Sequence, residues 1–212
     1  MIQPEKKMNI LAIGPHPDDI EIGCGASLAK FNAKGHSIYI FIATNGAAGG
    51  DPQIRRTEQE NSAQIMGVSE IFWGGYNDTD IIVDKNSIAS VEKTIHQINP
   101  DMILVNYHDD THQDHRNIAA ITSSATRYIR NVLFYETPTT QNFMPNIYVD
   151  IGAEFLATKL KALRAHASQI NRTNITNLSI IQVAESSAHF RGVQARVAYA
   201  EAFRSLRLFI NI

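Results

Sequence analysis

The sequence is almost devoid of cysteine: its 212 residues include only Cys24. A single cysteine excludes an internal disulfide and any zinc site built from several thiolates. Long apolar runs are also missing, since no stretch approaches the roughly 20 residues that a helix needs to cross a bilayer. The apolar run that follows Lys7 is too short for the core of a signal peptide. We therefore expect a cytoplasmic protein without a membrane span.

An excess of positive charge is absent as well. The chain carries 19 Lys and Arg against 21 Asp and Glu, which gives a formal net charge of -2 at pH 7. Proteins that bind nucleic acids usually gather basic side chains on one face, so we expect no nucleic-acid partner. The hydrophobic content of 44% is ordinary for a globular protein. A chain of this length buries enough surface to fold without disulfides.

What the sequence does contain is an alternation of short apolar runs and longer amphipathic ones. The apolar runs predict strands at residues 9–14, 37–43, 69–73, 101–105, 131–135 and 146–150. The amphipathic runs predict helices at residues 21–34, 54–66, 87–98, 115–129, 153–167 and 189–203. Apolar strands separated by helices are typical of a parallel sheet covered on both faces. We predict one α/β domain over residues 1–212, with a Rossmann-like, mostly parallel sheet and helices on both faces.

Polar side chains gather where two of these strands end. The strand at 9–14 is followed by His-Pro-Asp-Asp at residues 16–19, and the strand at 101–105 leads to His-Gln-Asp-His at residues 112–115. Ligands of such sheets bind in the crevice beyond the carboxyl ends of the strands. Both segments are therefore candidates for the functional site.

The residue types in these segments suit a metal centre, because imidazole and carboxylate both bind zinc and similar divalent ions. Of the adjacent Asp18 and Asp19, one can bind the metal while the other faces the attacking water. Of His112 and His115, one can complete the ligand set while the other stays free as an acid or base. Asp114 can then orient an imidazole. Three protein ligands plus water is the composition of a catalytic zinc site, whereas a structural site has four protein ligands.

Each segment also has an ordinary structural interpretation. Residues 16–19 can form a turn and a helix cap, since proline and aspartate favour both. Residues 112–115 can be a solvated helix start. The metal interpretation gains weight because both segments directly follow strands of one predicted sheet.

Taken together, these motifs resemble those of the PIG-L/LmbE-like zinc-dependent N-deacetylases. Pro-His-Pro-Asp-Asp-Ile-Glu at residues 15–21 resembles the first motif of that family, and residues 112–115 resemble the second. Residues 54–68 match its Arg-x-x-Glu helix. Three further segments resemble motifs in the carboxyl-terminal part of that family: residues 145–151, 159–169 and 199–203. The resemblance covers most of the chain.

The resemblance implies an enzyme that hydrolyses the N-acetyl group of an N-acetylated amino sugar or its conjugate, releasing acetate and a free amine. It implies that Zn²⁺, or another divalent transition metal such as Fe²⁺, is bound by His16, Asp19 and His115. It also implies a small-molecule amino-sugar substrate and a homo-oligomer.

The remaining catalytic roles follow from the same resemblance. Asp18 would be the general base, and His112 would stabilise the developing charge or protonate the leaving amine. Asp114 would tune His112, and Arg55 would bind the substrate.

Three further residues are candidates for substrate contact, each with a structural alternative. His166 belongs to a segment that often lies over the active site in this family, and it can equally be a packed or capping histidine. Tyr107 flanks the second motif and can instead have a structural role. Asn45 follows a strand and can instead shape a turn.

Two other functions remain open from the sequence. One keeps the metal site but changes the amide, giving a deacylase for a substrate without N-acetylglucosamine. The other is a non-catalytic module that binds a sugar or nucleotide. Asp18 and His112 argue against the second, because a binding module needs no acid or base. The first strand is also followed by no glycine-rich phosphate loop.

Overall fold

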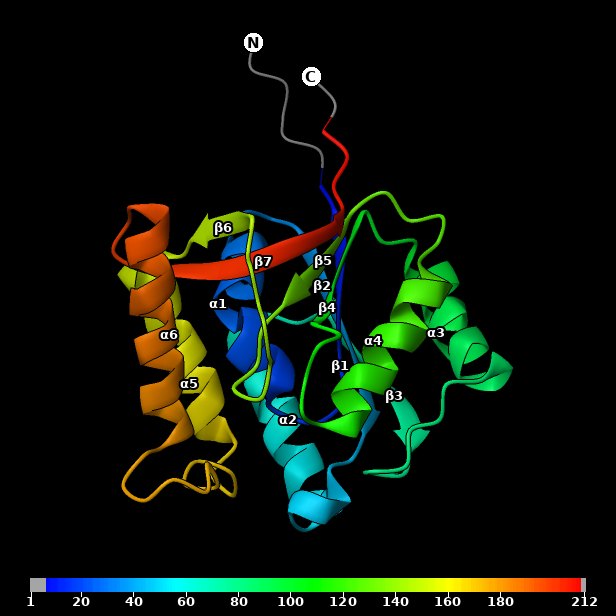
Figure 1. The fold of residues 1–212 in the computed structure, drawn as a ribbon, viewed down its shortest axis with the longest axis horizontal. Coiled ribbons are helices and arrows are strands. Elements are labelled where there is room, and N and C mark those ends of the chain that lie inside the picture. The colour runs from blue at the N-terminus through cyan, green and yellow to red at the C-terminus, as the bar shows by residue number, and fades with distance from the viewer. Residues whose placement is uncertain (1–6, 211–212) are drawn as a thin grey trace.

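The computed structural model describes residues 7–210, which are arranged around a seven-stranded sheet (Figure 1). The order of the strands across the sheet is β3-β2-β1-β4-β5-β7-β6. The strands are β1 (Asn9–Gly14), β2 (Ser37–Thr44), β3 (Glu70–Tyr76), β4 (Met102–Asn106), β5 (Val132–Tyr135), β6 (Ile147–Asp150) and β7 (Ala200–Arg207).

Most of the sheet is parallel. β1 pairs in parallel with both β2 and β4, β2 with β3, and β4 with β5, whereas β7 runs antiparallel to β5 and β6. The prediction of a single α/β domain with a mostly parallel sheet is confirmed. The predicted bounds 1–212 include residues 1–6 and 211–212, which lie outside the described residues, so these bounds stay a prediction.

Helices cover both faces of the sheet. Figure 1 shows α3 and α4 on one side, and α1, α2, α5 and α6 on the other. The helices are α1 (Asp19–Ala33), η1 (Ala47–Gly49, a single 3₁₀ turn), α2 (Pro52–Met66), α3 (Lys85–Ile98), α4 (Gln113–Ala125), α5 (Gly152–Ala165) and α6 (Ile180–Ala195).

Both faces of the central strands are buried, and the side chains alternate between them. Leu11 and Ile13 of β1 pack in the cluster that includes residues of α3 and α4. Ile10 and Ala12 pack in the cluster that includes residues of α1 and α2. This two-sided burial explains why the strands are near-continuous apolar runs in the sequence.

The topology creates a crevice between two neighbouring strands. β1 and β4 lie side by side, yet the chain continues from β1 into α1 on one face and from β4 into α4 on the other. The two connections diverge there, so the carboxyl ends of β1 and β4 border an open crevice. Both polar segments predicted from the sequence lie at this point.

The predicted helix at residues 189–203 is wrong in its bounds, because residues 189–195 belong to α6 but residues 200–203 do not. α6 begins earlier, where Ser179 and Gln182 form a capping box, and it ends at Arg196 in the left-handed region with a φ of 64°. Residues 200–207 form β7, which inserts between β5 and β6. Pairing with two strands that lie far away in the sequence thus overrides the local helical preference of Ala-Glu-Ala-Phe.

Within residues 7–210, the helices are all too short or too polar to be candidates for a membrane span.

Candidate active site

The first group of site residues follows β1 in a strained turn. Asp18 precedes α1 with a φ of 99°, a value that non-glycine residues rarely adopt. Two side chains of α2 hold this turn. Gln59 Oε1 accepts a hydrogen bond from the Asp18 backbone N–H at 3.3 Å, and Arg55 Nη2 donates to the Pro17 carbonyl at 2.7 Å. Such strain persists where surrounding contacts fix the backbone, and here they fix the direction of the Asp18 carboxylate.

The second group begins α4. His112 is the N-cap residue, and its Nδ1 accepts a hydrogen bond from the Asp114 backbone N–H at 3.2 Å. A neutral imidazole whose Nδ1 accepts carries its proton on Nε2. Asp110 Oδ1 accepts from the His112 backbone N–H at 2.9 Å, which fixes the turn before the helix. His112 is thereby oriented with a hydrogen-bond donor available at Nε2.

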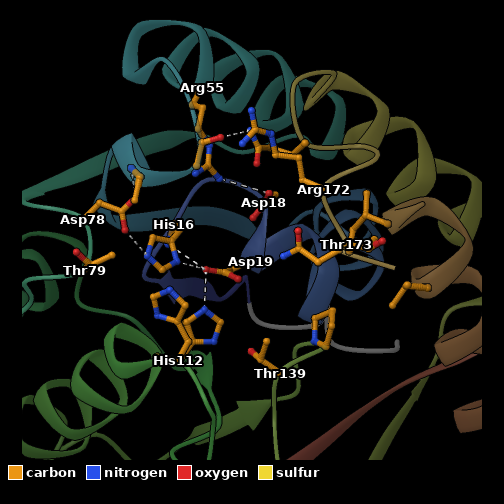
Figure 2. Close-up of a pocket in the computed structure, with 18 of the residues that line it drawn as sticks. His16, Asp18, Asp19, Arg55, Asp78, Thr79, His112, Thr139, Arg172 and Thr173 are labelled. Atoms are coloured by element: carbon orange, nitrogen blue, oxygen red, sulfur yellow. Dashed lines mark hydrogen bonds and ion pairs between the residues drawn. The ribbon is translucent and has the colours of Figure 1, made fainter. Parts of the chain in front are cut away.

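The two groups converge on the carboxylate of Asp19. His16 Nδ1 lies 3.1 Å and His115 Nε2 lies 3.4 Å from the same Asp19 Oδ2 atom (Figure 2). Two ligands of one tetrahedral zinc ion lie about 3.4 Å apart, given zinc–nitrogen distances of 2.0–2.1 Å. His112 is close by, with its ring centroid 4.7 Å from that of His16 and 5.0 Å from that of His115.

The outer nitrogen atoms of both histidines face carboxylates. His16 Nε2 lies 3.0 Å from Asp78 Oδ1 and 3.1 Å from Asp114 Oδ2, and His115 Nδ1 lies 3.1 Å from Asp110 Oδ2. A histidine that donates one N–H to a carboxylate presents the other nitrogen as a metal ligand, and this pairing is usual around metal-binding histidines. These contacts suit a divalent metal beside His16, Asp19 and His115, and ligand atoms of His16, His112 and His115 all lie within 4.8 Å of one another.

The electrostatic field of the site also favours a cation. Burial alone would lower the pKa of His115, but Asp19 and Asp110 outweigh it and raise that pKa to about 9. For His16, the carboxylates of Asp114, Asp19 and Asp78 likewise overcome burial and raise the pKa well above its usual range. A field that holds protons on two buried imidazoles attracts a divalent cation at the same place.

Asp18 and His112 have the opposite environments. Burial and the neighbouring charge of Asp19 raise the pKa of Asp18 to about 6, although Arg55 opposes the shift. Burial and the charges of His16 and His115 lower the pKa of His112. At neutral pH, Asp18 is thus a carboxylate of raised basicity and His112 is a neutral donor.

A pocket of about 510 Å³ opens over these residues. Its inner part contains the metal-ligand candidates together with Asp18, Asp78 and His112. Its outer part is formed by the segment between α5 and α6, by α6 itself and by Pro138 and Thr139. Figure 2 shows Arg172, Thr173 and Thr139 of this part. The volume lies within the usual range for small-molecule sites.

Comparison with known proteins agrees with this geometry. The family profile PIG-L, described as GlcNAc-PI de-N-acetylase, matches residues 11–126. The chain belongs to the PIG-L family. Among relatives, it is 39% identical over 171 residues to an uncharacterised deacetylase, YaiS, of Escherichia coli strain K12, with 77% of this chain and 92% of that protein covered.

Solved structures show the same fold. An N,N'-diacetylchitobiose deacetylase from Pyrococcus horikoshii, 26% identical, superposes with a TM-score of 0.83 over 97% of this chain and 86% of its own. A 4-carboxy-2-hydroxymuconate hydratase from Pseudomonas putida, 18% identical, has a TM-score of 0.81 over 97% of this chain and 99% of its own. The fold alone therefore does not define the reaction, and the site residues have to be considered.

The structure brings together the six PIG-L motif residues named from the sequence, with one difference in their contacts. His16, Asp18, Asp19, His112 and His115 all line the pocket. Asp114 was expected to act on His112. Its carboxylate instead contacts His16 and accepts from the Thr79 backbone N–H at 2.7 Å, and its hydrogen bond to His112 comes from its own backbone N–H.

The substrate-contact candidates are less uniform, since in the described part of the chain Arg55 lines the pocket and the other three do not. Tyr107 is buried against Phe134 and Phe143. His166 is fully buried, with Nε2 3.5 Å from Glu21 Oε1. Asn45 is half-buried in the turn after β2.

Asp78 and Gln59 are among the contributors to the site that were not predicted from the sequence. Asp78 follows β3, and it contacts His16 from a third strand end. The predicted strand at 69–73 ended too early to place Asp78 beside the crevice. Gln59 was missed because its role depends on a long-range contact: its Nε2 donates to Glu21 Oε1 at 2.6 Å while its Oε1 holds the Asp18 backbone. No pattern within α2 reveals that contact.

Proposed function

We propose that this PIG-L family protein is a metal-dependent N-deacetylase that hydrolyses the N-acetyl group of an amino sugar or its conjugate. One observation carries the proposal: a carboxylate of raised pKa and a neutral histidine flank a fitting set of three metal ligands in one pocket. A module that only binds its ligand needs neither group.

The roles of the residues follow from their environments. Asp18 accepts a proton from the water that attacks the acetyl carbonyl, for which a pKa near neutrality is well suited. His112 presents Nε2–H to the oxygen that becomes negative, or passes a proton to the leaving nitrogen, because an amide anion is too poor a leaving group. The bond between the carbonyl carbon and nitrogen breaks, giving acetate and a free amine.

The metal is proposed to be Zn²⁺, with Fe²⁺ as the principal alternative, because histidine and carboxylate ligands suit both. When bound by His16, Asp19 and His115, it would supply Lewis acidity for the carbonyl and lower the pKa of water. Asp114, Asp78 and Asp110 would keep the two imidazoles in the orientation that ligation needs. Elemental analysis of the purified protein identifies the metal.

Acetate release from a panel of N-acetylhexosamines and their conjugates, with and without a chelator, tests the proposal. We expect chelator-sensitive acetate release that a divalent metal restores. Acetate release that persists in chelator would contradict the metal requirement. Release of other acids from amides that lack an amino sugar would favour the second candidate, a deacylase.

Assembly and location are proposed separately. We infer a homo-oligomer, with some support from the exposed apolar side chains Phe190 and Val193 of α6. Light scattering at several protein concentrations tests it. The cytoplasmic location expected from the sequence stays a prediction.

A further inference from the structure

The segment that connects α5 to α6, residues 166–179, forms a self-supporting wall of the pocket, here called the roof loop. The Ile180 backbone N–H donates to the Ile170 carbonyl at 2.9 Å, which closes the loop on itself. Thr173 Oγ1 donates to the Leu178 carbonyl at 2.6 Å across its interior. Loops closed in this way hold their side chains in defined positions.

The base of the roof loop is fixed to α2 and to the turn before it. Glu58 accepts hydrogen bonds from both the backbone N–H and the hydroxyl of Ser168, each at 2.7 Å. Gln169 Nε2 donates to the Gly49 carbonyl at 3.3 Å. The roof loop is therefore a fixed wall of the pocket, and it is anchored to α2, the helix that carries Arg55.

The outer part of the pocket differs in chemistry from the inner part. It is lined by the apolar side chains of Ile175, Ile180 and Val183, with Arg172 and Thr173 beside them. In Figure 2, Arg172 and Thr173 lie on the side of the pocket away from His112. An acetyl group at Asp18 and His112 would thus place the rest of the substrate against this wall.

The two arginines of the pocket are in contrasting states. The Arg55 guanidinium is occupied: Nη1 donates to the Gly46 carbonyl at 2.8 Å and Nη2 to the Pro17 carbonyl at 2.7 Å, and Nη2 also lies 3.4 Å from Asp18 Oδ2. The Arg172 guanidinium is exposed and has no hydrogen-bond or ion-pair partner among the residues that the structure describes. Of the two arginines that line the pocket in the described part of the chain, Arg172 is the one whose guanidinium is available to a ligand.

We infer that the outer part of the pocket binds an anionic group, a carboxylate or a phosphate, on the aglycone of the substrate, through Arg172. This inference rests on the proposed function and narrows its substrate class to conjugates with a charged aglycone. The planar guanidinium matches both anions with two parallel hydrogen bonds. The apolar side chains that line the same part of the pocket accept the body of the aglycone, whereas the lining carboxylates, Asp18, Asp19 and Asp78, belong to its inner part.

Matched substrates test the inference. Acetate release is measured from the para-carboxyphenyl, para-phosphonophenyl and para-carbamoylphenyl glycosides of N-acetylglucosamine, which differ in charge at one position. For the wild type we expect kcat/KM to favour an anionic glycoside by about threefold to tenfold, mainly through KM, as for a partly exposed charge-assisted contact. Comparison of kcat/KM for the carboxyphenyl and phosphonophenyl glycosides shows whether the site prefers a carboxylate or a phosphate.

Two variants assign the preference to Arg172. Arg172→Gln should reduce the preference, measured as the ratio of kcat/KM for an anionic glycoside to that for the carbamoyl glycoside, to within about twofold. Arg164→Gln, which changes an exposed arginine of α5 outside the pocket, should retain the wild-type preference. Equal rates for all three glycosides in the wild type, or a preference that survives in Arg172→Gln, would overturn the inference.

Binding measurements distinguish failure of this inference from failure of the proposed function. The dissociation constants of the three glycosides are measured by calorimetry with wild-type and Arg172→Gln protein. Acetate release without charge preference leaves the deacetylase in place and removes the anion site. Charge-selective binding that needs Arg172, without acetate release, retains the anion site and removes the proposed activity.

Discussion

At the scale of single residues, Asp18 and Asp19 are adjacent in the chain and yet occupy opposite electrostatic environments. Burial would raise the pKa of Asp19, but His115 and His16 outweigh it and hold that pKa well below the usual range. Asp18 contacts the Arg55 guanidinium at 3.4 Å, but burial and the charge of Asp19 prevail and raise its pKa to about 6. The left-handed backbone of Asp18 turns the two carboxylates apart, so one suits a metal and the other a proton.

Replacing Asp18 with asparagine should separate the two roles. We expect Asp18→Asn to keep its metal and to lose about 10²- to 10⁴-fold in kcat, the usual contribution of a positioned base. His115→Ala is the matched contrast and should lose the metal. Metal content by elemental analysis and acetate release are measured on both. Near-wild-type turnover in Asp18→Asn would show that another group accepts the proton.

Asp78 provides a sharper test of the site, because no sequence pattern pointed to it. Its Oδ1 lies 3.0 Å from His16 Nε2, beside Asp114. Removing one such carboxylate typically costs about 10- to 100-fold in metal affinity, so Asp78→Asn should weaken metal binding by that amount.

Competition with a chromogenic chelator measures the affinity. Asp80→Asn, an exposed change in the same loop, is the control and should bind metal as the wild type does. Equal affinities for the two variants would mean that Asp114 alone orients His16.

At the scale of helices and strands, the sequence predicted what depends on local pattern. The apolar runs located β1 to β6 because a buried parallel strand needs apolar side chains on both faces. Asp18 and His112 were found because they follow strand ends. β7 was missed, since Ala-Glu-Ala-Phe has no strand pattern and is held in the sheet by β5 and β6. The contact of Gln59 with Asp18 was also missed, because it joins residues that lie far apart in the sequence.

The cap of α3 provides a test at this scale. Asp84 Oδ1 accepts from the Ser87 backbone N–H at 2.8 Å, and Ser87 Oγ accepts from the Asp84 backbone N–H at 3.0 Å. The backbone hydrogen bond from Ser87 lowers the pKa of Asp84. A carboxylate with a lowered folded-state pKa stabilises the fold above its unfolded-state pKa, and this contribution disappears as the pH falls through the folded-state value.

Asp84→Ala should therefore lower the free energy of unfolding at neutral pH, and its difference from the wild type should shrink below about pH 4. Asp84→Asn keeps a good cap that does not titrate, so it should stay close to the wild type at neutral pH. Urea unfolding at several pH values measures this. A difference between wild type and Asp84→Ala that is independent of pH would contradict the role of the charge.

At the scale of the whole molecule, a buried ion pair joins the last strand to the helices behind the site. Lys159 Nζ of α5 lies 2.7 Å from Glu201 Oε1 of β7, and both side chains are 3% exposed. Glu201 also accepts from the backbone N–H groups of Ala26 and Ser27 in α1. This one carboxylate thereby links β7, α1 and α5, and Lys159 Nζ also donates to the Ile22 carbonyl of α1 at 2.6 Å.

Removing one partner of such a pair leaves the other charge buried and uncompensated, which typically costs about 3–5 kcal/mol. Lys159→Met should accordingly lower the melting temperature by roughly 10 °C for a domain of this size. Arg127→Met is the control: it breaks a pair with Glu92 in which the arginine side chain is 55% exposed, so it should cost less than about 1 kcal/mol. Calorimetry compares the two. Similar melting temperatures would mean that the two N–H groups of α1 suffice to hold the Glu201 charge, and that β7 is kept in the sheet by its strand pairing alone.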